Sequence, residues 1–411
     1  MRPHHVRGYG VATLALSVLA ALGCSSTAPS IAGRWDAVVD VNGVEVPFRF
    51  DVEADATRAS GVFFNGDERI PSTAGTFADG VLTLAFDHYA TRVEARLVDG
   101  RLEGQYVRAR GAPYIFRARF TTAPSAPAAE GPSIGGVWII PTQSSKGEAA
   151  WRFIVHQTGP DVSAAILRVD GDTGALTGRF QGDRFVLSHF SGQRPLLLEI
   201  TLEPDGSLAI LQNKRTRMTA VREEHARERH VAAPADPSTH SFAKNAAEPF
   251  RFSFPDADGR TISNDDARFQ NKVVVVSITG TWCPNCHDEA PFLTDLHKRY
   301  RSLGLEVVAL SFEEAAQLQD PARLRAYAAR YGIEYPMLLA GVPDELAVKV
   351  PQIENLNSFP TTIFLGRDGT VREVHAGFPS KASGRFYSET IESIERLVEA
   401  LLTDTQRRGT S

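Results

Sequence analysis

The first half of the 411-residue chain repeats itself, and this repetition restricts the fold more than any other feature of the sequence. Three features recur at an offset of 103 residues: Gly33-Arg34-Trp35 as Gly136-Val137-Trp138, Gly75 as Gly178, and Leu84 as Leu187. Alternating runs such as "GVLTLAF" and "RFVLSHF", separated by Asp-Gly and Gly-Asp turns, are typical of antiparallel strands. We therefore expect two tandem antiparallel β-sandwich or barrel units, at residues 31–121 and 134–222.

Two stretches that are poor in large apolar residues separate these units from each other and from the rest of the chain. The first, "TTAPSAPAAEGPS", covers residues 121–133, and the second is the charged and Pro/Ala-rich segment 223–249. Such compositions bury too little apolar surface to form a core, so we expect linkers here. A chain of this length is also expected to contain two or three cores. The sequence thus predicts a multidomain protein with a third domain at residues 250–404.

The overall composition is that of a soluble globular protein, with 43% hydrophobic and 23% charged residues. The net charge is -5, and the sequence contains no long basic runs. Because a nucleic-acid partner requires a basic surface that neutralises phosphates, we expect no nucleic-acid binding.

The third domain alternates strands with helices. "NKVVVVSI" is a continuous β-branched run, which suits a strand buried on both faces, and a helix is expected from Pro284. "LEVVALSF" and "EYPMLLA" are further strands, with the helical segment "DPARLRAYAARYG" between them. A hairpin that turns at Asp368-Gly369 precedes an amphipathic helix from Arg385 to Leu402. This order predicts an α/β sandwich with a mixed sheet.

The N-terminus has the layout of a secretory signal. Arg2 and Arg7 lead into the apolar run "VATLALSVLAALGC", which is too short for a comfortable membrane span. Its end resembles a bacterial lipoprotein cleavage site, although leucine stands two positions before the cysteine rather than three. We expect residues 1–23 to be removed and Cys24 to carry lipid, with the outer membrane favoured because serines follow it.

Once Cys24 is set aside, the chain keeps only two cysteines, Cys283 and Cys286, and therefore has no structural disulfide framework. The pair follows the first buried strand, where open α/β sheets place their reactive groups. Cys283 is expected at the start of a helix, with Pro284 at the first position, so the helix N-terminus favours its thiolate. Cys286 lies one turn further along the same side. We expect Cys283 to be the attacking thiol and Cys286 the buried resolving thiol.

A carboxyl group is expected near this pair. On a helical wheel Glu289 lies about 60° from Cys286, at the edge of the core, whereas Asp288 faces away. A buried carboxyl has a raised pKa and can take or give the proton that thiol-disulfide exchange requires. The simpler interpretation is that Glu289 is a solvated helix residue, and the sequence leaves both open.

These motifs resemble those of the thioredoxin superfamily, and specifically of extracytoplasmic thiol-disulfide oxidoreductases of the TlpA/ResA type. The resemblance covers the third domain and rests on "GTWCPNCHDEAP", "PDADGRTIS" and "FPTTIFLGRDGTV". It implies a cis-proline at Pro360 that faces the disulfide, and it assigns the family's acidic residue to Glu289. Ser277 stands where thioredoxins proper have a buried aspartate, which favours the TlpA-like branch. The residues expected to surround the disulfide are Trp282, Pro284, Asn285 and Phe359, of which Phe359 is bulkier than the usual residue.

The resemblance implies a function as well. The protein would exchange its disulfide or dithiol with protein thiols outside the cytoplasm, as a reductase, without a cofactor. A membrane electron donor of the thiol-reductase type would be a second partner, and lipid on Cys24 would hold the protein at the membrane.

Other interpretations of the same residues compete with this one. Cys-x-x-Cys followed by His287 also fits c-type haem attachment, but Met337 is the only methionine available as a second ligand in the domain. His287 is expected to be exposed instead. No second Cys or His pair completes a zinc site, so we expect no metal. The Thr-x-x-Cys loop of a peroxiredoxin is absent. The remaining alternative is a surface lipoprotein whose β-repeats bind a protein or an apolar ligand.

Overall fold

The computed structural model describes residues 30–55, 57–121 and 130–404, together with Met1 and His4. Cys24 and most of the expected signal segment lie outside the described residues, so the lipidation site has no structural description. From Ala32 onward the chain forms one compact unit.

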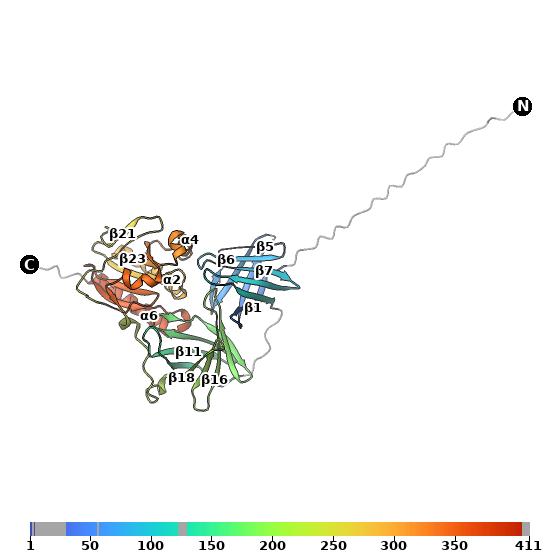
Figure 1. The fold of residues 1–411 in the computed structure, drawn as a ribbon, viewed down its shortest axis with the longest axis horizontal. Coiled ribbons are helices and arrows are strands. Elements are labelled where there is room, and N and C mark those ends of the chain that lie inside the picture. The colour runs from blue at the N-terminus through green and yellow to red at the C-terminus, as the bar shows by residue number, and fades with distance from the viewer. Residues whose placement is uncertain (2–3, 5–29, 56, 122–129, 405–411) are drawn as a thin grey trace, which may run out of the picture. The chain divides into compact units, whose positions relative to one another are not determined.

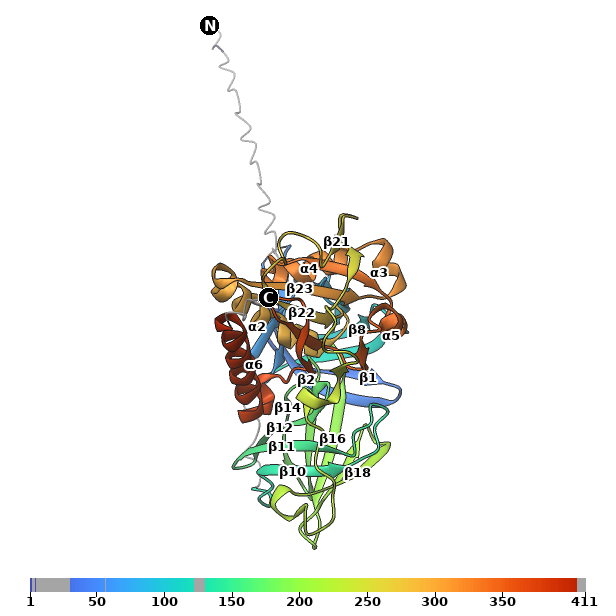
Figure 2. The same cartoon turned by 90° about the vertical axis from the view of Figure 1, so that its left-hand side faces the viewer.

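The second β unit is a closed barrel. Its strands are β10 (Gly136–Pro141), β11 (Ala150–Thr158), β12 (Asp161–Arg168), β13 (Gly171–Asp172), β14 (Leu176–Gln181), β15 (Arg184–His189), β16 (Leu196–Leu202), β17 (Leu208–Gln212) and β18 (Thr216–Arg222). Eight of them pair in chain order, and the pairings β10–β18 and β11–β12 close the ring (Figure 2). The short β13 extends β12 as a hairpin outside this ring. Inward-facing side chains such as Trp138 and Phe153 are fully buried and fill the interior.

The first β unit has the same strand order but remains open. Its strands are β1 (Gly33–Val41), β2 (Val44–Ala54), β3 (Ala59–Asn65), β4 (Glu68–Pro71), β5 (Ala74–Ala78), β6 (Val81–Phe86), β7 (Thr91–Val98), β8 (Arg101–Val107) and β9 (Tyr114–Phe120). They form one continuous sheet from β4 to β5. A single bridge between Arg58 and Thr76 joins the two sides of the gap. The unit is therefore a half-barrel.

The repeated residues occupy equivalent positions in the two units. Gly75 pairs with Leu84 across β5 and β6, and Gly178 pairs with Leu187 across β14 and β15. A Cβ atom on Gly178 would lie 1.9 Å from a backbone oxygen of β15, so a side chain has no room there. The predicted pair of tandem β units is confirmed.

The stretch 223–249 carries short elements of its own. These are the 3₁₀ turn η1 (Glu223–His225), the helix α1 (Pro237–His240) and the strand β19 (Phe242–Ala243). β19 pairs with β25 (Ile353–Glu354) of the third domain, so the end of this stretch is tied to that domain.

The third domain is the expected mixed α/β sandwich (Figure 1). Its strands are β20 (Ser253–Pro255), β21 (Thr261–Ser263), β22 (Val273–Thr279), β23 (Leu305–Phe312), β24 (Met337–Gly341), β26 (Thr361–Leu365) and β27 (Val371–Ala376). Its helices are α2 (Pro284–Tyr300), α3 (Ala315–Gln319), α4 (Ala322–Tyr331), α5 (Leu346–Lys349) and α6 (Arg385–Thr403), with 3₁₀ turns η2 (Arg301–Leu303), η3 (Pro343–Glu345) and η4 (Lys381–Ser383). The sheet order is β24-β23-β22-β26-β27, with β22, β23 and β24 parallel.

The central strand β22 explains why this sheet is covered on both sides. All seven of its residues are buried. Val273 and Val275 pack into a core with α2, α4 and α6, whereas Val274 and Val276 pack into a second core on the other face. The β-branched run therefore fixes the plane of the sheet, and the loop that follows β22 emerges between the two cores.

Candidate active site

The cysteine pair lies between the end of β22 and the first turn of α2. Cys283 precedes the helix in an extended conformation, and Pro284 occupies the first helical position, where its missing N–H breaks no helical hydrogen bond. The backbone N–H of Cys286 donates to the Cys283 carbonyl at 3.1 Å, which closes the first turn. Both cysteines are free thiols and are at most 1% exposed. The two sulfur atoms thus share one buried site.

The surroundings shift the pKa values of the two thiols in opposite directions. Burial acts to raise the pKa of Cys283, but the hydrogen bond with Cys286 and the positive charge of Arg194 outweigh it and leave the pKa below its ordinary value. For Cys286, burial and the interaction with Cys283 both raise the pKa far above its ordinary value. The first thiol is therefore the one that ionises, as an attacking group must.

A buried carboxylate holds the loop just before Cys283. Glu313 accepts hydrogen bonds from the Thr281 N–H at 2.8 Å and from the Thr281 hydroxyl at 2.6 Å. Arg323 is ion-paired with the same carboxylate at 2.9 Å, and both side chains are nearly inaccessible. Glu313 was not among the residues expected at the site. Its position in the sequence could have indicated it, because Glu313 directly follows β23 and so lies at the same edge of the sheet as the cysteines.

Glu289 lies in the core beneath the pair, with only 2% of its surface exposed. Ser277 on β22 donates to its Oε2 at 2.8 Å, and Thr362 on β26 donates to its Oε1. Burial raises the pKa of Glu289 to about 7, although these two hydrogen bonds oppose the shift. Its charge in turn contributes to the raised pKa of Cys286. A carboxyl with this pKa can exchange a proton at neutral pH.

Phe359 and Pro360 directly precede β26, and Phe359 contacts the first cysteine. The Phe359-Pro360 peptide bond is cis. The Cys283 thiol is within hydrogen-bonding distance of the Phe359 carbonyl oxygen, at 3.4 Å. The Phe359 ring also meets the Trp282 ring edge to face, with centroids 5.1 Å apart. The structure therefore brings Cys283, Trp282 and Phe359 together, with Pro360 next in the chain after Phe359.

The prediction that His287 is exposed is wrong. Its ring is 5% exposed, accepts a hydrogen bond from the Tyr331 hydroxyl at 2.8 Å, and donates to the Thr281 carbonyl at 2.8 Å. Tyr89 of the first β unit packs on it, with ring centroids 4.2 Å apart. Burial, with a smaller effect from His88, lowers its pKa well below the ordinary value. His287 is therefore a neutral, fully bonded packing residue.

Asp288 does face away from the core of its own domain, but it is only half-exposed. Burial, together with the charges of Asp172 and Glu68 from the two β units, raises its pKa well above the ordinary value. Asp288 is therefore not a freely solvated carboxyl group, and it cannot serve as an unperturbed control in experiments on Glu289.

Asn285, between the two cysteines, contacts the second β unit. Its Nδ2 donates to the Asp170 carbonyl at 2.5 Å, and its Oδ1 accepts from Arg194 at 3.1 Å. Only 1% of Asn285 is exposed. The β units are thus in direct contact with the cysteine loop, which sequence patterns within a single domain do not reveal.

Two general features can be stated for the described part of the chain. No group of three or more His, Cys, Asp and Glu side chains there is arranged to hold a metal ion. Within the same residues, no helix combines the length and apolar character needed to cross a membrane.

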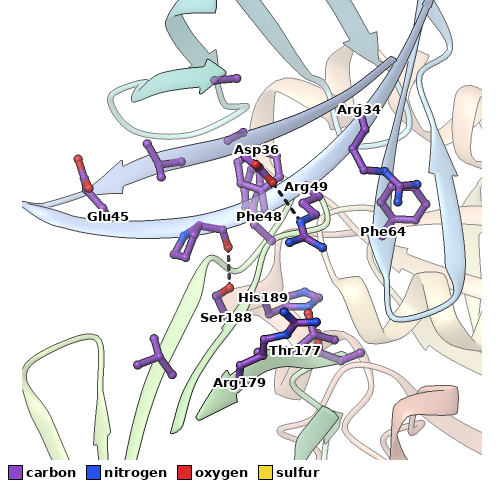
Figure 3. A pocket seen from close by; sticks show the side chains of 18 of the residues that line it. Arg34, Asp36, Glu45, Phe48, Arg49, Phe64, Thr177, Arg179, Ser188 and His189 are labelled. Carbon is purple, nitrogen blue, oxygen red and sulfur yellow. Dashed lines mark hydrogen bonds and ion pairs between the residues drawn. The ribbon is translucent and has the colours of Figure 1, made fainter. Parts of the chain in front are cut away.

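A separate cleft of about 1280 Å³ lies between the first and second β units (Figure 3). Phe48, Arg49 and Asp36 line it from the first unit, and Ser188 and His189 line it from the second. The Ser188 hydroxyl donates to the Pro47 carbonyl at 2.6 Å across the contact. No residue of the third domain lines this cleft, so it is distinct from the cysteine site.

Comparisons with known proteins concern the third domain. Residues 245–374 match the model of the AhpC/TSA family. The chain is 30% identical over 130 residues to the thioredoxin-like protein YneN of Bacillus subtilis, which covers 31% of this chain and 71% of YneN. It is 25% identical over 137 residues to the thiol-disulfide oxidoreductase ResA of Halalkalibacterium halodurans, which covers 33% of this chain and 71% of that protein.

Solved structures were compared with the chain as well. A thiol:disulfide interchange protein of the thioredoxin family from Chlorobium tepidum is 25% identical, covers 41% of this chain and 99% of its own, and has a TM-score of 0.30. A putative thiol:disulfide interchange protein DsbE from Chlorobium tepidum is 19% identical, covers 38% of this chain and 98% of its own, and has the same TM-score of 0.30.

Proposed function

The chain belongs to the thioredoxin-like thiol-disulfide oxidoreductases of the TlpA/ResA type, and on this premise we propose that its Cys283–Cys286 pair reduces disulfides in partner proteins. The observation that carries the proposal is the placement of two buried thiols at the start of α2, with Cys283 directly before the helix and Cys286 in its first turn. Their pKa values are shifted in opposite directions, down for Cys283 and up for Cys286. A low pKa favours attack, and a high pKa keeps the second thiol protonated until it is needed.

The reaction proceeds in two exchanges. The Cys283 thiolate attacks one sulfur of a partner disulfide, which forms a mixed disulfide and releases the partner's other sulfur as a thiolate. Cys286 then loses its proton and attacks the Cys283 sulfur, which releases the partner's second thiolate and leaves the Cys283–Cys286 disulfide. Two electrons pass to the partner, and a protein thiol donor must later return two electrons to this pair.

Glu289 is the group that supports proton transfer in the second exchange. It lies one helical turn after Cys286, and burial raises its pKa to about 7. As a carboxylate it accepts the proton that Cys286 loses when it attacks. The hydroxyls of Ser277 and Thr362 hold the carboxyl in place, because each donates a hydrogen bond to one of its oxygens.

Pro360, Phe359, Trp282, Pro284 and Asn285 make up the surroundings of the pair in this proposal. Because Phe359 contacts both Cys283 and Trp282, its bulk limits what can approach the attacking sulfur from that side. No cofactor takes part, since both exchanges use sulfur atoms and one carboxyl group only.

We place the reaction outside the cytoplasm, at a membrane. The support is the N-terminal sequence, in which a signal-like segment ends at Cys24. In this setting the lipid on Cys24 anchors the chain, the outer membrane is the favoured location, and a membrane thiol-reductase supplies the electrons.

The direct test is the redox equilibrium of the full chain. After incubation with graded mixtures of reduced and oxidised dithiothreitol, alkylation and mass spectrometry give the fraction that carries the Cys283–Cys286 disulfide. We expect a single two-electron transition and reduction of insulin disulfides by the reduced chain. A pair that stays reduced in every mixture contradicts the proposal.

The alternative function is a surface module that binds a protein or an apolar ligand through the β units. Its support is the cleft between these units, although charged residues such as Arg49, Asp36 and Arg179 contribute much of its lining. The barrel interior is filled by Trp138, Phe153 and their neighbours. A chain with both Cys283 and Cys286 replaced by serine distinguishes the two functions, because it retains cellular activity only if binding through the β units is the function.

A further inference from the structure

Cys283 is chemically suited to attack, yet it is sterically closed. Its exposed surface is 0% of the ordinary value for a cysteine. Thiol-disulfide exchange requires the attacking sulfur to reach a partner's sulfur, so a reactive cysteine is normally accessible at least in part. Because Cys283 is inaccessible to solvent, other residues must lie over the cysteine loop.

Tyr89 of the first β unit packs on His287, and the second β unit contributes the groups that contact the residues between the two cysteines. Asp170 and Arg194 both hydrogen-bond to Asn285, the residue between Pro284 and Cys286. The charges of these same two side chains act on the Cys283 thiol in opposite directions. The turn between β12 and β13 and the loop before β16 therefore lie against the N-terminal end of α2.

The contact is close enough to require glycine on both sides. Gly171 forms a parallel bridge with Phe378, and a Cβ atom on Gly171 would lie 2.3 Å from the Asn285 side chain and 2.3 Å from the Phe378 oxygen. A Cβ atom on Gly377 would lie 2.3 Å from the Val169 oxygen. Backbone meets backbone at this point, which a side chain on either residue would prevent.

A buried carboxylate fastens the contact. Asp172 at the end of β13 is 0% exposed. Its Oδ2 accepts hydrogen bonds from the Ser380 N–H at 2.8 Å and the Ser380 hydroxyl at 3.0 Å, and it also accepts one from the Ser383 hydroxyl. Hydrogen bonds to a charged acceptor are the stronger kind, and a carboxylate without them would be costly to bury. Oδ1 accepts a hydrogen bond from the Gly174 N–H within the barrel at 2.8 Å, whereas Oδ2 is satisfied only while the β unit and the third domain are together.

We propose that the second β unit is a cover over the attacking thiol, fastened by Asp172, and that partner disulfides reach Cys283 only when this cover opens. The inference rests on the proposed function, because it concerns access to the same pair. In the closed state the contacts of Gly171 and Asp170 occupy the approach to the cysteine loop. Local opening of such a contact is an equilibrium, and its free energy sets the fraction of molecules that can react.

The test is the rate at which iodoacetamide alkylates Cys283 in the reduced full chain, followed by peptide mass spectrometry. Rates are compared at the plateau of the pH profile, where the thiolate is fully formed, so that changes in acidity do not enter. Asp172→Ala removes the acceptor of all three hydrogen bonds from the third domain, together with that of the Gly174 N–H in the barrel. We expect its plateau rate to exceed that of the wild type at least tenfold. Asp183→Ala, an exposed position in the β14–β15 turn of the same barrel, should react like the wild type.

Ser383→Ala guards against a folding defect in the barrel, because it removes one donor to Asp172 from the side of the third domain. We expect it to react faster than the wild type but more slowly than Asp172→Ala. Plateau rates that are the same in the wild type, Asp172→Ala and Ser383→Ala overturn the cover. Plateau alkylation rates measure access to Cys283, whereas the dithiothreitol equilibrium measures whether the cysteine pair forms a reversible disulfide. Either proposal can therefore be refuted without the other.

Discussion

Replacement of Glu289 by glutamine should remove a pH dependence from the stability of the third domain. The side chain is 2% exposed, and its two oxygens accept hydrogen bonds from Ser277 and Thr362. Glutamine has nearly the same shape, and serine and threonine hydroxyls can accept as well as donate, so both contacts can be kept. The substitution therefore removes the ionisation while it preserves the packing.

The size of the effect follows from the acidity of the buried carboxyl. Burial raises the pKa of Glu289 from 4.5 to about 7, so the folded state holds this proton more tightly than the unfolded chain does. The free energy of unfolding of the wild type should consequently fall as pH rises from 4.5 to about 7 and stay low above that. At about 1.36 kcal/mol per pKa unit, the loss amounts to roughly 3 kcal/mol. Glu289→Gln should lack this loss.

The assay is urea unfolding of the reduced full chain at a series of pH values from 4 to 8. At each urea concentration, a brief hydrogen-exchange pulse is applied at fixed pH, and exchange is measured in the peptide that contains β22. Exchange in this peptide reports the unfolding of the third domain, so unfolding of the β units does not contribute to the signal. The stability of Glu289→Gln relative to the wild type should rise by about 3 kcal/mol across this range. Asp295→Asn serves as the matched control, because Asp295 is on the same helix with its side chain 64% exposed. If both variants track the wild type at a constant offset, Glu289 is not a perturbed buried acid.

Three further predictions concern other residues. Thr281→Val removes the hydroxyl that donates to Glu313 and should lower the free energy of unfolding by about 1–3 kcal/mol in the same assay, whereas Thr390→Val, whose hydroxyl bonds only to its own helix, should change it by less than about 0.5 kcal/mol. Tyr327→Phe loses the hydrogen bond to the Cys286 carbonyl and should lower the free energy of unfolding by about 1 kcal/mol. An unchanged urea midpoint would argue against that contact. Cys24→Ala should move the protein from the membrane fraction to the soluble one, and unchanged membrane association with an unchanged mature mass would refute lipidation.

The architecture was accessible from sequence where local pattern and burial agree. The β-branched run of β22 could be assigned because each of its faces meets an apolar layer, so no polar alternation was needed. The repeat was visible because positions such as Gly75 and Gly178 tolerate only glycine opposite a neighbouring strand. The wheel placed Glu289 toward the core, since the helix axis and the position of Cys286 together fix its direction.

Contacts between domains were not accessible in the same way. His287 belongs to a charged run, "HDE", that is typical of a solvated helix face, yet Tyr89 of the first β unit covers it. Asp288 is half-buried for the same reason. The periodicity of a segment indicates which of its faces is apolar and packs on the core of its own domain. It does not indicate whether another domain will cover the polar face. The contacts of Asn285 with Asp170 and Arg194 fall in this class.

Trapping of mixed disulfides in the full chain with single cysteine variants tests directly which thiol attacks and which resolves. If Cys283 is the attacking thiol and Cys286 resolves the intermediate, Cys286→Ser should accumulate covalent complexes with partner proteins through Cys283, because nothing remains to release them. Cys283→Ser should accumulate none, since the buried thiol of Cys286 has a raised pKa and stays protonated. Equal trapping by both variants, or trapping by Cys283→Ser alone, would contradict the account.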